Sequence, residues 1–179
     1  MSVHEHHRGQ GANLHLNLGV LTSSDSRSPE TDTSGNMIAE LLIKAGHQVG
    51  YRAVLPDDLE ALRAAVEEHL AVLDGIIITG GTGIGTRDVT IEAVRPLLDK
   101  ELDGFGELFR MLSFQEIGSA AMMSRAIAGI SNHRLIVALP GSPAACRLAM
   151  DRLLIPELGH IAGLLKGPTD SHHRRASPA

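Results

Sequence analysis

Hydrophobic residues recur along the chain with two alternating periods, which predict strands and helices in turn. Apolar and polar or small residues alternate over residues 14–20, and this predicts a strand with one buried face. Apolar residues then recur at helical spacing over 37–45, and Gly46 follows where a helix commonly ends. Residues 48–54 are predicted to form a second strand.

The rest of the chain continues this alternation. Helical apolar stripes run over 59–70 and 105–112, and continuous apolar runs at 76–79 and 135–139 are typical of central strands covered on both faces. Ser142-Pro143 is a favourable helix start, with serine as cap and proline at the first helical position. Strands alternating with helices predict an α/β fold in which a mainly parallel sheet lies between helical layers.

Length and composition indicate one ordinary globular domain. The chain has 179 residues, of which 43% are hydrophobic and 21% are charged. We predict a single domain over 13–166 with flexible polar tails at 1–12 and 167–179. The single cysteine, Cys146, excludes an internal disulfide and is predicted to be a small core residue rather than a nucleophile.

Charge and aromatic content exclude some classes of partner. A net charge of −5 and an aromatic fraction of 2% argue against a general nucleic-acid binder, because such proteins use basic surfaces and stacking rings. The polar N-terminus contains no apolar signal-peptide core, and no apolar run is long enough to span a membrane. We therefore expect a cytoplasmic protein with no membrane partner.

Polar or glycine-rich loops follow four of the predicted strands. These loops are residues 22–34, 56–58, 79–88 and 140–143. Ligands of parallel α/β sheets bind outside the carboxyl ends of the strands. Four such loops on one rim predict a site for a large phosphorylated ligand.

The glycine-rich loop at 79–88 carries most of this information. Its glycines let the backbone approach a ligand closely, and exposed N–H groups in such a turn form an anion site. The loop matches neither the Walker A pattern nor the dinucleotide fingerprint. A tight strand-to-helix turn without a ligand is the alternative. The candidate phosphate-binding residues are Thr79, Gly80, Gly81, Thr82, Gly83, Gly85 and Arg87.

Six short segments occur in an order that is specific in combination. They are Thr-Gly-Gly-Thr-Gly at 79–83, Arg-Asp-Val-Thr at 87–90, Gly-Phe-Gly-Glu at 104–107, Arg-Met-Leu-Ser-Phe at 110–114, Ser-Arg-Ala at 124–126 and Leu-Pro-Gly-Ser-Pro at 139–143. Together they closely resemble the molybdopterin-binding family, which includes molybdenum cofactor biosynthesis protein B and the Mog-type molybdopterin adenylyltransferases. The resemblance runs from about residue 14 to residue 160, and the segments at 32–35 and 110–114 look more like the protein B branch.

This resemblance implies a three-layer α/β/α sandwich that assembles as a homotrimer or as paired trimers. It also implies a reaction in which molybdopterin and ATP give adenylyl-molybdopterin and pyrophosphate, with Mg²⁺. Other enzymes of molybdenum cofactor synthesis are candidate partners. The alternative function is a carrier of the same family that binds molybdopterin without adenylylating it, but the intact Arg-Asp-Val-Thr run favours an enzyme.

Two carboxylates, Asp57 and Asp88, match functional positions of the family. The attacking group is a phosphate with a second pKa of about 6, so the reaction needs no strong base. Its main cost is the approach of two anions, which Mg²⁺ held by carboxylates offsets. Both residues are therefore predicted to be catalytic and to bind Mg²⁺, Asp88 chiefly by organising metal and phosphate, and Asp57 by binding metal or positioning substrate.

Both aspartates also have a structural alternative. Asp57 with Glu60 three residues later resembles a capping box before the helical stripe at 59–70, and Asp58 is the neighbour with which Asp57 is most easily confused. Asp88 is placed to cap a short helix beginning near Thr90. One aspartate can serve both purposes.

Three further groups of residues are candidates for substrate binding. The first group lies in a loop that either holds the pterin or its phosphate or forms a solvated turn. The resemblance assigns the second group, two serines, to the pterin-side wall of the site. The third group places a helix N-terminus on the rim, where it suits a phosphate or simply caps the helix. These residues are, in order, Ser24, Asp25 and Ser26; Ser113 and Ser119; and Pro140, Gly141 and Ser142.

Overall fold

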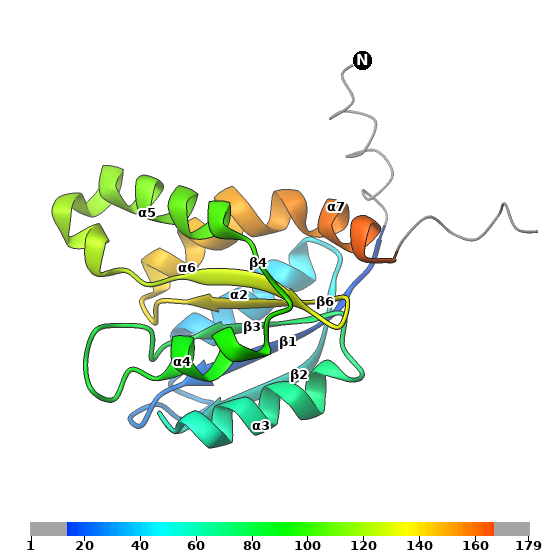
Figure 1. Ribbon diagram of the computed structural model, residues 1–179, viewed down its shortest axis with the longest axis horizontal. Helices are drawn as coiled ribbons and strands as arrows, with labels where there is room; N and C mark the ends of the chain where they lie inside the picture. Colours follow the sequence, from blue (N-terminus) through cyan, green and yellow to red (C-terminus); the bar gives the residue numbers. More distant parts are fainter. Residues whose placement is uncertain (1–13, 167–179) are drawn as a thin grey trace, which may run out of the picture.

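The apolar runs form the centre of a six-stranded sheet in the computed structural model, which describes residues 14–166 (Figure 1). The strand order is β2-β1-β3-β6-β5-β4. The first three strands and β6 pair in parallel, whereas β5 is antiparallel to both of its neighbours, so the prediction of a mainly parallel sheet is confirmed. The strands are β1 (Asn17–Ser23), β2 (Gln48–Leu55), β3 (Gly75–Thr79), β4 (Lys100–Glu101), β5 (Ile127–Ser131) and β6 (Arg134–Leu139).

Helices cover both faces of this sheet and complete the predicted three-layer α/β/α sandwich (Figure 1). One face carries α2 (Thr33–Lys44), α5 (Asp103–Ile117), α6 (Pro143–Ala149) and α7 (Ile155–Lys166). A wider helical turn over Met150–Leu154 joins α6 to α7. The other face carries α3 (Leu59–Leu70) and α4 (Thr90–Val94), and 3-10 turns occupy Arg95–Leu97 and Gly118–Met123.

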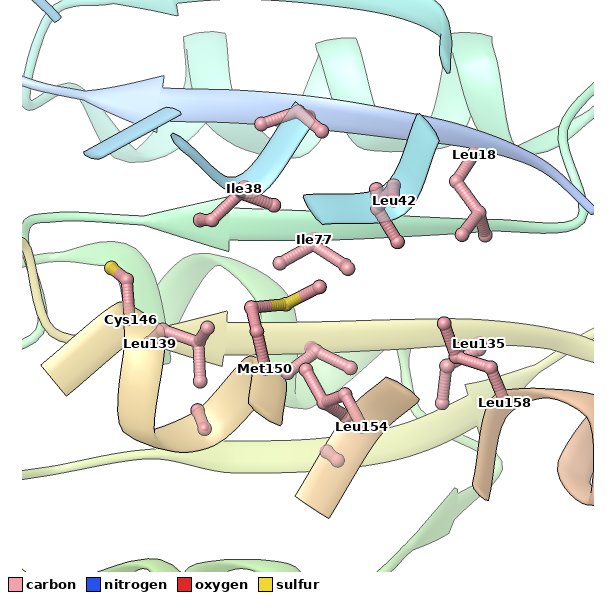
Figure 2. Close-up of a cluster of buried hydrophobic side chains, with 14 of the residues drawn as sticks. Leu18, Ile38, Leu42, Ile77, Leu135, Leu139, Cys146, Met150, Leu154 and Leu158 are labelled. Atoms are coloured by element: carbon pink, nitrogen blue, oxygen red, sulfur yellow. The ribbon is translucent and has the colours of Figure 1, made fainter. Parts of the chain in front are cut away.

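The sheet separates two hydrophobic clusters. Leu42 of α2 packs toward Ile77 of β3 in the cluster shown in Figure 2, together with residues of α6 and α7. Leu62 of α3 belongs to the opposite cluster with Ile76 and Ile78. Because successive strand residues point to opposite faces, the three central positions of β3 must all be apolar, which explains its run of three isoleucines at 76–78.

Two expectations drawn from the hydrophobic pattern are wrong. β1 is buried on both faces rather than one, because it lies between β2 and β3 and has helices on either side. Leu108, placed by its spacing in the buried stripe at 105–112, is 47% exposed, whereas Phe109 is completely buried. The sequence also gave no expectation for β4 and β5, since both are short and carry little periodic signal.

The structure places the four loops that the sequence singled out at the same end of the molecule. They follow β1, β2, β3 and β6, the four parallel strands, at their carboxyl ends (Figure 1). The predicted tails at 1–12 and 167–179 lie outside the described residues. Within residues 14–166, none of the helices combines the length and apolar character that crossing a membrane requires.

Candidate functional site

The loops at the carboxyl ends of the parallel strands surround a cavity of about 430 Å³. This volume is in the range of small-molecule binding sites. Its wall is formed by the carboxyl end of β1, by the segments that follow β1, β2, β3 and β6, and by the end of the turn at Gly118–Met123 with Ser124 after it. The lining residues are Ser23, Ser24, Asp57, Gly80, Gly81, Thr82, Gly83, Asp88, Met123, Ser124, Pro140 and Gly141.

The glycine loop leaves β3 through a sharp turn that only glycine accommodates readily. Gly80 and Gly81 have φ angles of +93° and +60°. The Gly80 N–H donates to the Leu139 carbonyl over 3.0 Å. Thr90 fixes the other side, because its N–H donates to the Gly81 carbonyl (2.9 Å) and its hydroxyl donates to the Gly80 carbonyl (2.8 Å). The base of the loop is therefore held firmly against β6 and α4.

Three successive backbone N–H groups of this loop have no acceptor within residues 14–166. Those of Gly81, Thr82 and Gly83 make no hydrogen bond to any atom within the part of the chain that the structure describes. All three residues line the cavity. Successive unpaired N–H groups in a concave turn attract anions, and phosphate oxygens are suitable acceptors for them.

The Asp57 carboxylate faces the cavity instead of capping a helix. It accepts a hydrogen bond of 2.5 Å from the Ser23 hydroxyl, at the end of β1. The cap of α3 is Asp58, whose carboxylate accepts from the Ala61 N–H at 2.8 Å. Glu60 does not complete a capping box and instead lies 3.6 Å from an Arg63 nitrogen. The capping interpretation of Asp57 is thus wrong: Asp58 caps α3, and Asp57 is the one of the two that lines the cavity.

The Asp88 carboxylate also belongs to the cavity. It accepts from the Gly85 N–H at 2.8 Å, across the tip of the glycine loop. Residue 89 occupies the cap position of α4, and no side chain donates or accepts there. The capping interpretation of Asp88 is therefore wrong as well. Its carboxylate closes the loop on itself, and Asp88 lines the same cavity as Asp57.

An ion pair between Arg87 and Asp25 joins the glycine loop to the loop that follows β1. Asp25 also accepts a hydrogen bond from the Asp57 N–H at 3.2 Å, so the first loop touches both later loops. The Arg87 side chain is 69% exposed, and a pair this exposed contributes little to stability. An incoming anion can therefore bind Arg87 in place of Asp25 with only a small loss of folding stability.

The remaining candidate residues fall outside the cavity wall. Thr79 is fully buried and donates to the Pro140 carbonyl at 2.9 Å, so it supports the wall from behind. Ser142 caps α6, with its hydroxyl 3.3 Å from the Ala145 N–H. Gly85 lies at the loop tip, Ser26 and Ser119 are exposed, and Ser113 is buried in α5.

Two lining residues, Met123 and Ser124, were not expected from the sequence. Ser23, which the sequence placed in the loop at 22–34, is the last residue of β1 and lines the cavity as well. Met123 and Ser124 reach the cavity from the segment between α5 and β5, which has no periodic signal. Only the resemblance of the segment at 124–126 to the family pointed to this region.

Cys146 is a core residue, as predicted. It is completely buried, and its sulfur lies 3.1 Å from both the Thr79 hydroxyl and the Pro140 carbonyl. Burial raises the pKa of the Cys146 thiol to about 11. The thiol is therefore protonated at neutral pH and is not a nucleophile.

Asp32 fixes the first loop to the sheet. It caps α2 by accepting from the Gly35 N–H, and it also accepts from Thr22 (2.6 Å) and from Arg52 (2.7 Å). Burial alone would raise the pKa of Asp32, but the hydrogen bonds from Thr22, Gly35 and Arg52 outweigh it and hold the pKa below its ordinary value of 3.8. The folded protein thus stabilises the charged form of this side chain.

We expect Asp32→Asn to lower the free energy of unfolding by about 1–2 kcal/mol near neutral pH, because the amide keeps the cap but loses the charge beside Arg52. Since the pKa is lower in the folded state, this contribution is complete above the unfolded value and is lost as the pH falls through the folded value. Urea denaturation should therefore show a constant difference in unfolding free energy between the two proteins from about pH 7 to about pH 5, and a narrowing difference as the pH falls further to about pH 3. A difference that stays constant down to about pH 3 would contradict this assignment.

Comparison with known proteins finds close relatives over nearly the whole chain. Residues 19–160 match the family described as "probable molybdopterin binding domain". Molybdenum cofactor biosynthesis protein B of Bacillus cereus is 49% identical over 164 residues, which cover 90% of this chain and 96% of that protein. A crystal structure of a molybdenum cofactor biosynthesis protein B has a TM-score of 0.82 at 49% identity and covers 86% of this chain and 97% of its own. The tungsten cofactor synthesizing protein MoaB from Pyrococcus furiosus has a TM-score of 0.73 at 39% identity, with 82% and 94% covered.

Proposed function

Since this chain belongs to the molybdopterin-binding domain family and has a role in molybdenum cofactor biosynthesis, we propose that it is a molybdopterin adenylyltransferase. In the proposed reaction, a terminal phosphate oxygen of molybdopterin attacks the α-phosphorus of ATP. A new phosphorus–oxygen bond forms, the bond from the α-phosphorus to the bridging oxygen breaks, and pyrophosphate leaves. The products are adenylyl-molybdopterin and pyrophosphate.

One observation carries this proposal: three successive N–H donors that have no acceptor in the described part of the chain line the same cavity as two carboxylates. The donors at Gly81, Thr82 and Gly83 suit phosphate oxygens. The carboxylates of Asp57 and Asp88 would repel a bound phosphate unless a cation lies between them. A site that only held the phosphate of a pterin would not need two carboxylates beside the phosphate donors, whereas a metal–nucleotide complex uses both kinds of group.

Mg²⁺ fits the donor set that the chain provides. Mg²⁺ is commonly held by one or two carboxylates together with substrate phosphates rather than by an all-protein cage. Asp57 and Asp88 would hold it in this way, and the ion would neutralise charge between the two anionic substrates. Residues 14–166 contain no group of three or more His, Cys, Asp or Glu side chains that could hold a metal by themselves.

The chain's own groups would orient the reactants and stabilise charge. The attacking phosphate has a second pKa of about 6 and is already ionised at neutral pH, so no residue has to remove a proton. The loop N–H groups donate to phosphate oxygens whose charge increases during transfer. The hydrogen bond from Ser23 holds the Asp57 carboxylate toward the cavity. When substrate phosphate replaces Asp25 as its partner, Arg87 adds a positive charge beside the glycine loop.

The test is direct. Purified protein is incubated with fresh molybdopterin, ATP and Mg²⁺, and adenylyl-molybdopterin and pyrophosphate are followed by mass spectrometry and an enzymatic pyrophosphate assay. We expect pyrophosphate release only when molybdopterin is present. About one pyrophosphate should form for each adenylyl-molybdopterin. Binding of molybdopterin without product formation would instead support the carrier function and would remove the catalytic roles of both aspartates.

We also propose that the protein assembles as a homo-oligomer, a trimer or paired trimers. Apolar side chains are unusually exposed along α5 and the 3-10 turn that follows it, and Phe114 is 62% and Met122 81% exposed. Exposed apolar surface of this extent marks an interaction face. The exposed set is Leu108, Met111, Phe114, Ile117, Met122 and Met123.

Phe114→Asp is expected to shift the assembly to monomers, because a desolvated carboxylate in an apolar interface costs several kcal/mol, on the order of 2–5. Sedimentation velocity at micromolar protein would measure the change. Val72→Asp is the matched control, since Val72 is 74% exposed but lies after α3, away from this face. An oligomer that survives Phe114→Asp, or that Val72→Asp disrupts equally, would place the interface elsewhere.

A further inference from the structure

Arg125 donates hydrogen bonds to the glycine loop from outside the cavity. Its Nε donates to the Thr82 carbonyl at 2.8 Å, and its Nη2 donates to the Asp88 carbonyl at 3.3 Å. The same guanidinium contacts both carboxylate oxygens of Glu92, in α4, at 2.5 and 3.3 Å. Arg125 does not line the cavity itself. One planar group therefore connects the two ends of the loop tip to the helix that follows.

This contact fixes the direction of an N–H group that the site uses. In a trans peptide, the carbonyl of one residue and the N–H of the next point in opposite directions, and the described chain contains no cis peptide. A Thr82 carbonyl held by Arg125 therefore turns the Gly83 N–H to the side away from the guanidinium. Gly83 lines the cavity, and its N–H is one of the three without an acceptor in residues 14–166.

The second contact constrains Asp88. Its backbone carbonyl is held by Arg125 while its side chain accepts from the Gly85 N–H. Both the backbone and the carboxylate of Asp88 are thereby restrained before any ligand arrives. Preorganised donors and charges are the groups that stabilise a transition state most effectively.

Stability alone does not account for this arrangement. The side chains of Arg125 and Glu92 are 33% and 48% exposed, and ion pairs with this exposure contribute little to folding. The hydrogen bond from Arg125 lowers the pKa of Glu92, so the carboxylate is charged throughout the neutral range. Lysine cannot replace the arrangement, because a single ammonium group lacks the planar fork that reaches two carbonyls and a carboxylate together.

We propose that Arg125 is a positioning residue that holds the glycine loop, through the Thr82 and Asp88 carbonyls, in the geometry that binds and activates substrate phosphate. This assignment rests on the proposed adenylyl transfer for its catalytic consequence, but the restraint on the loop does not. Glu92 anchors the guanidinium to α4 and acts through Arg125.

Arg125→Lys tests the proposal, with Arg95→Lys as matched control. Arg95 makes a comparable two-point ion pair with Glu101, at 3.1 Å for both contacts, but within residues 14–166 it makes no side-chain hydrogen bond or ion pair to the glycine loop. Amide hydrogen exchange is measured by mass spectrometry on peptides covering 80–90, where the amides of Gly85, Asp88 and Thr90 are hydrogen bonded. We expect exchange there to accelerate about tenfold in Arg125→Lys and to stay unchanged in Arg95→Lys.

Activity supplies the second readout. For Arg125→Lys we expect kcat for adenylyl transfer to fall about tenfold or more, with a thermal midpoint close to that of Arg95→Lys. If amide exchange over 80–90 in Arg125→Lys were as slow as in the wild type, Arg125 would not restrain the loop. The same conclusion would follow if exchange accelerated equally in β3 and β6. Faster loop exchange with an unchanged kcat would overturn the catalytic role. If the wild type itself makes no product, the adenylyltransferase proposal fails while the exchange result still decides whether Arg125 restrains the loop.

Discussion

Replacing Asp88 with Asn is expected to lower kcat for adenylyl transfer about 100- to 1000-fold while the protein stays folded. The amide has the same shape, and its oxygen can still accept from the Gly85 N–H, so the loop retains its closing hydrogen bond. What disappears is the charge that holds a cation against the substrate phosphates. Pyrophosphate release gives the rate, and the thermal midpoint, expected within a few degrees of wild type, reports the fold.

Asp57 and Asp58 supply an internal control for this prediction. Asp57→Asn should lose activity to a similar extent, because its carboxylate lines the cavity. Asp58→Asn should keep it, because Asn caps a helix about as well as Asp and Asp58 points to the Ala61 N–H. If Asp58→Asn lost activity and Asp57→Asn kept it, the roles assigned to the two residues would be reversed. Equal activity in all three variants would remove the carboxylates from the mechanism.

Gly80→Ala is expected to destabilise the protein by about 3 kcal/mol or more and to abolish ligand binding. A Cβ at this position would lie well under 3.0 Å from the Ser23 carbonyl oxygen, a backbone atom of β1 that cannot move aside, and φ is +93°. Relief would require β1 and the glycine loop to separate, which would open the cavity between Asp57 and the loop. Urea denaturation and calorimetric titration with ATP and Mg²⁺ would measure the two effects.

Gly163→Ala is the matched control for this substitution. Gly163 lies in α7, and a Cβ there would meet no atom within 4 Å. The change should stabilise the protein by about 0.5–1 kcal/mol, because alanine loses less backbone entropy in a helix. If Gly80→Ala were tolerated as well as Gly163→Ala, the turn out of β3 would have to adopt another conformation, and the anion site built on it would be wrong.

The sequence by itself determined the layered fold and the rim on which the site lies. The continuous apolar run of β3 needs cover on both faces, and only a central strand receives it. Parallel strands place their carboxyl ends along one edge, so the loops after β1, β2, β3 and β6 had to converge. The glycine spacing at 79–88 likewise indicated an anion site, because positive φ angles and close approach to a ligand both favour glycine.

Only the tertiary structure decided which side chains reach that rim. Asp57 and Asp58 are adjacent residues of the same type, and the sequence allows either of them to cap α3. The contact of Asp57 with Ser23, 34 residues earlier, distinguishes the two. Arg125 acts on a carbonyl 43 residues earlier in the chain, at Thr82. Hydrophobic periodicity shows which residues a few positions apart share one face of a helix or strand. It carries no information on contacts between strand ends, which depend on strand order and on the pairing of β5 with β6.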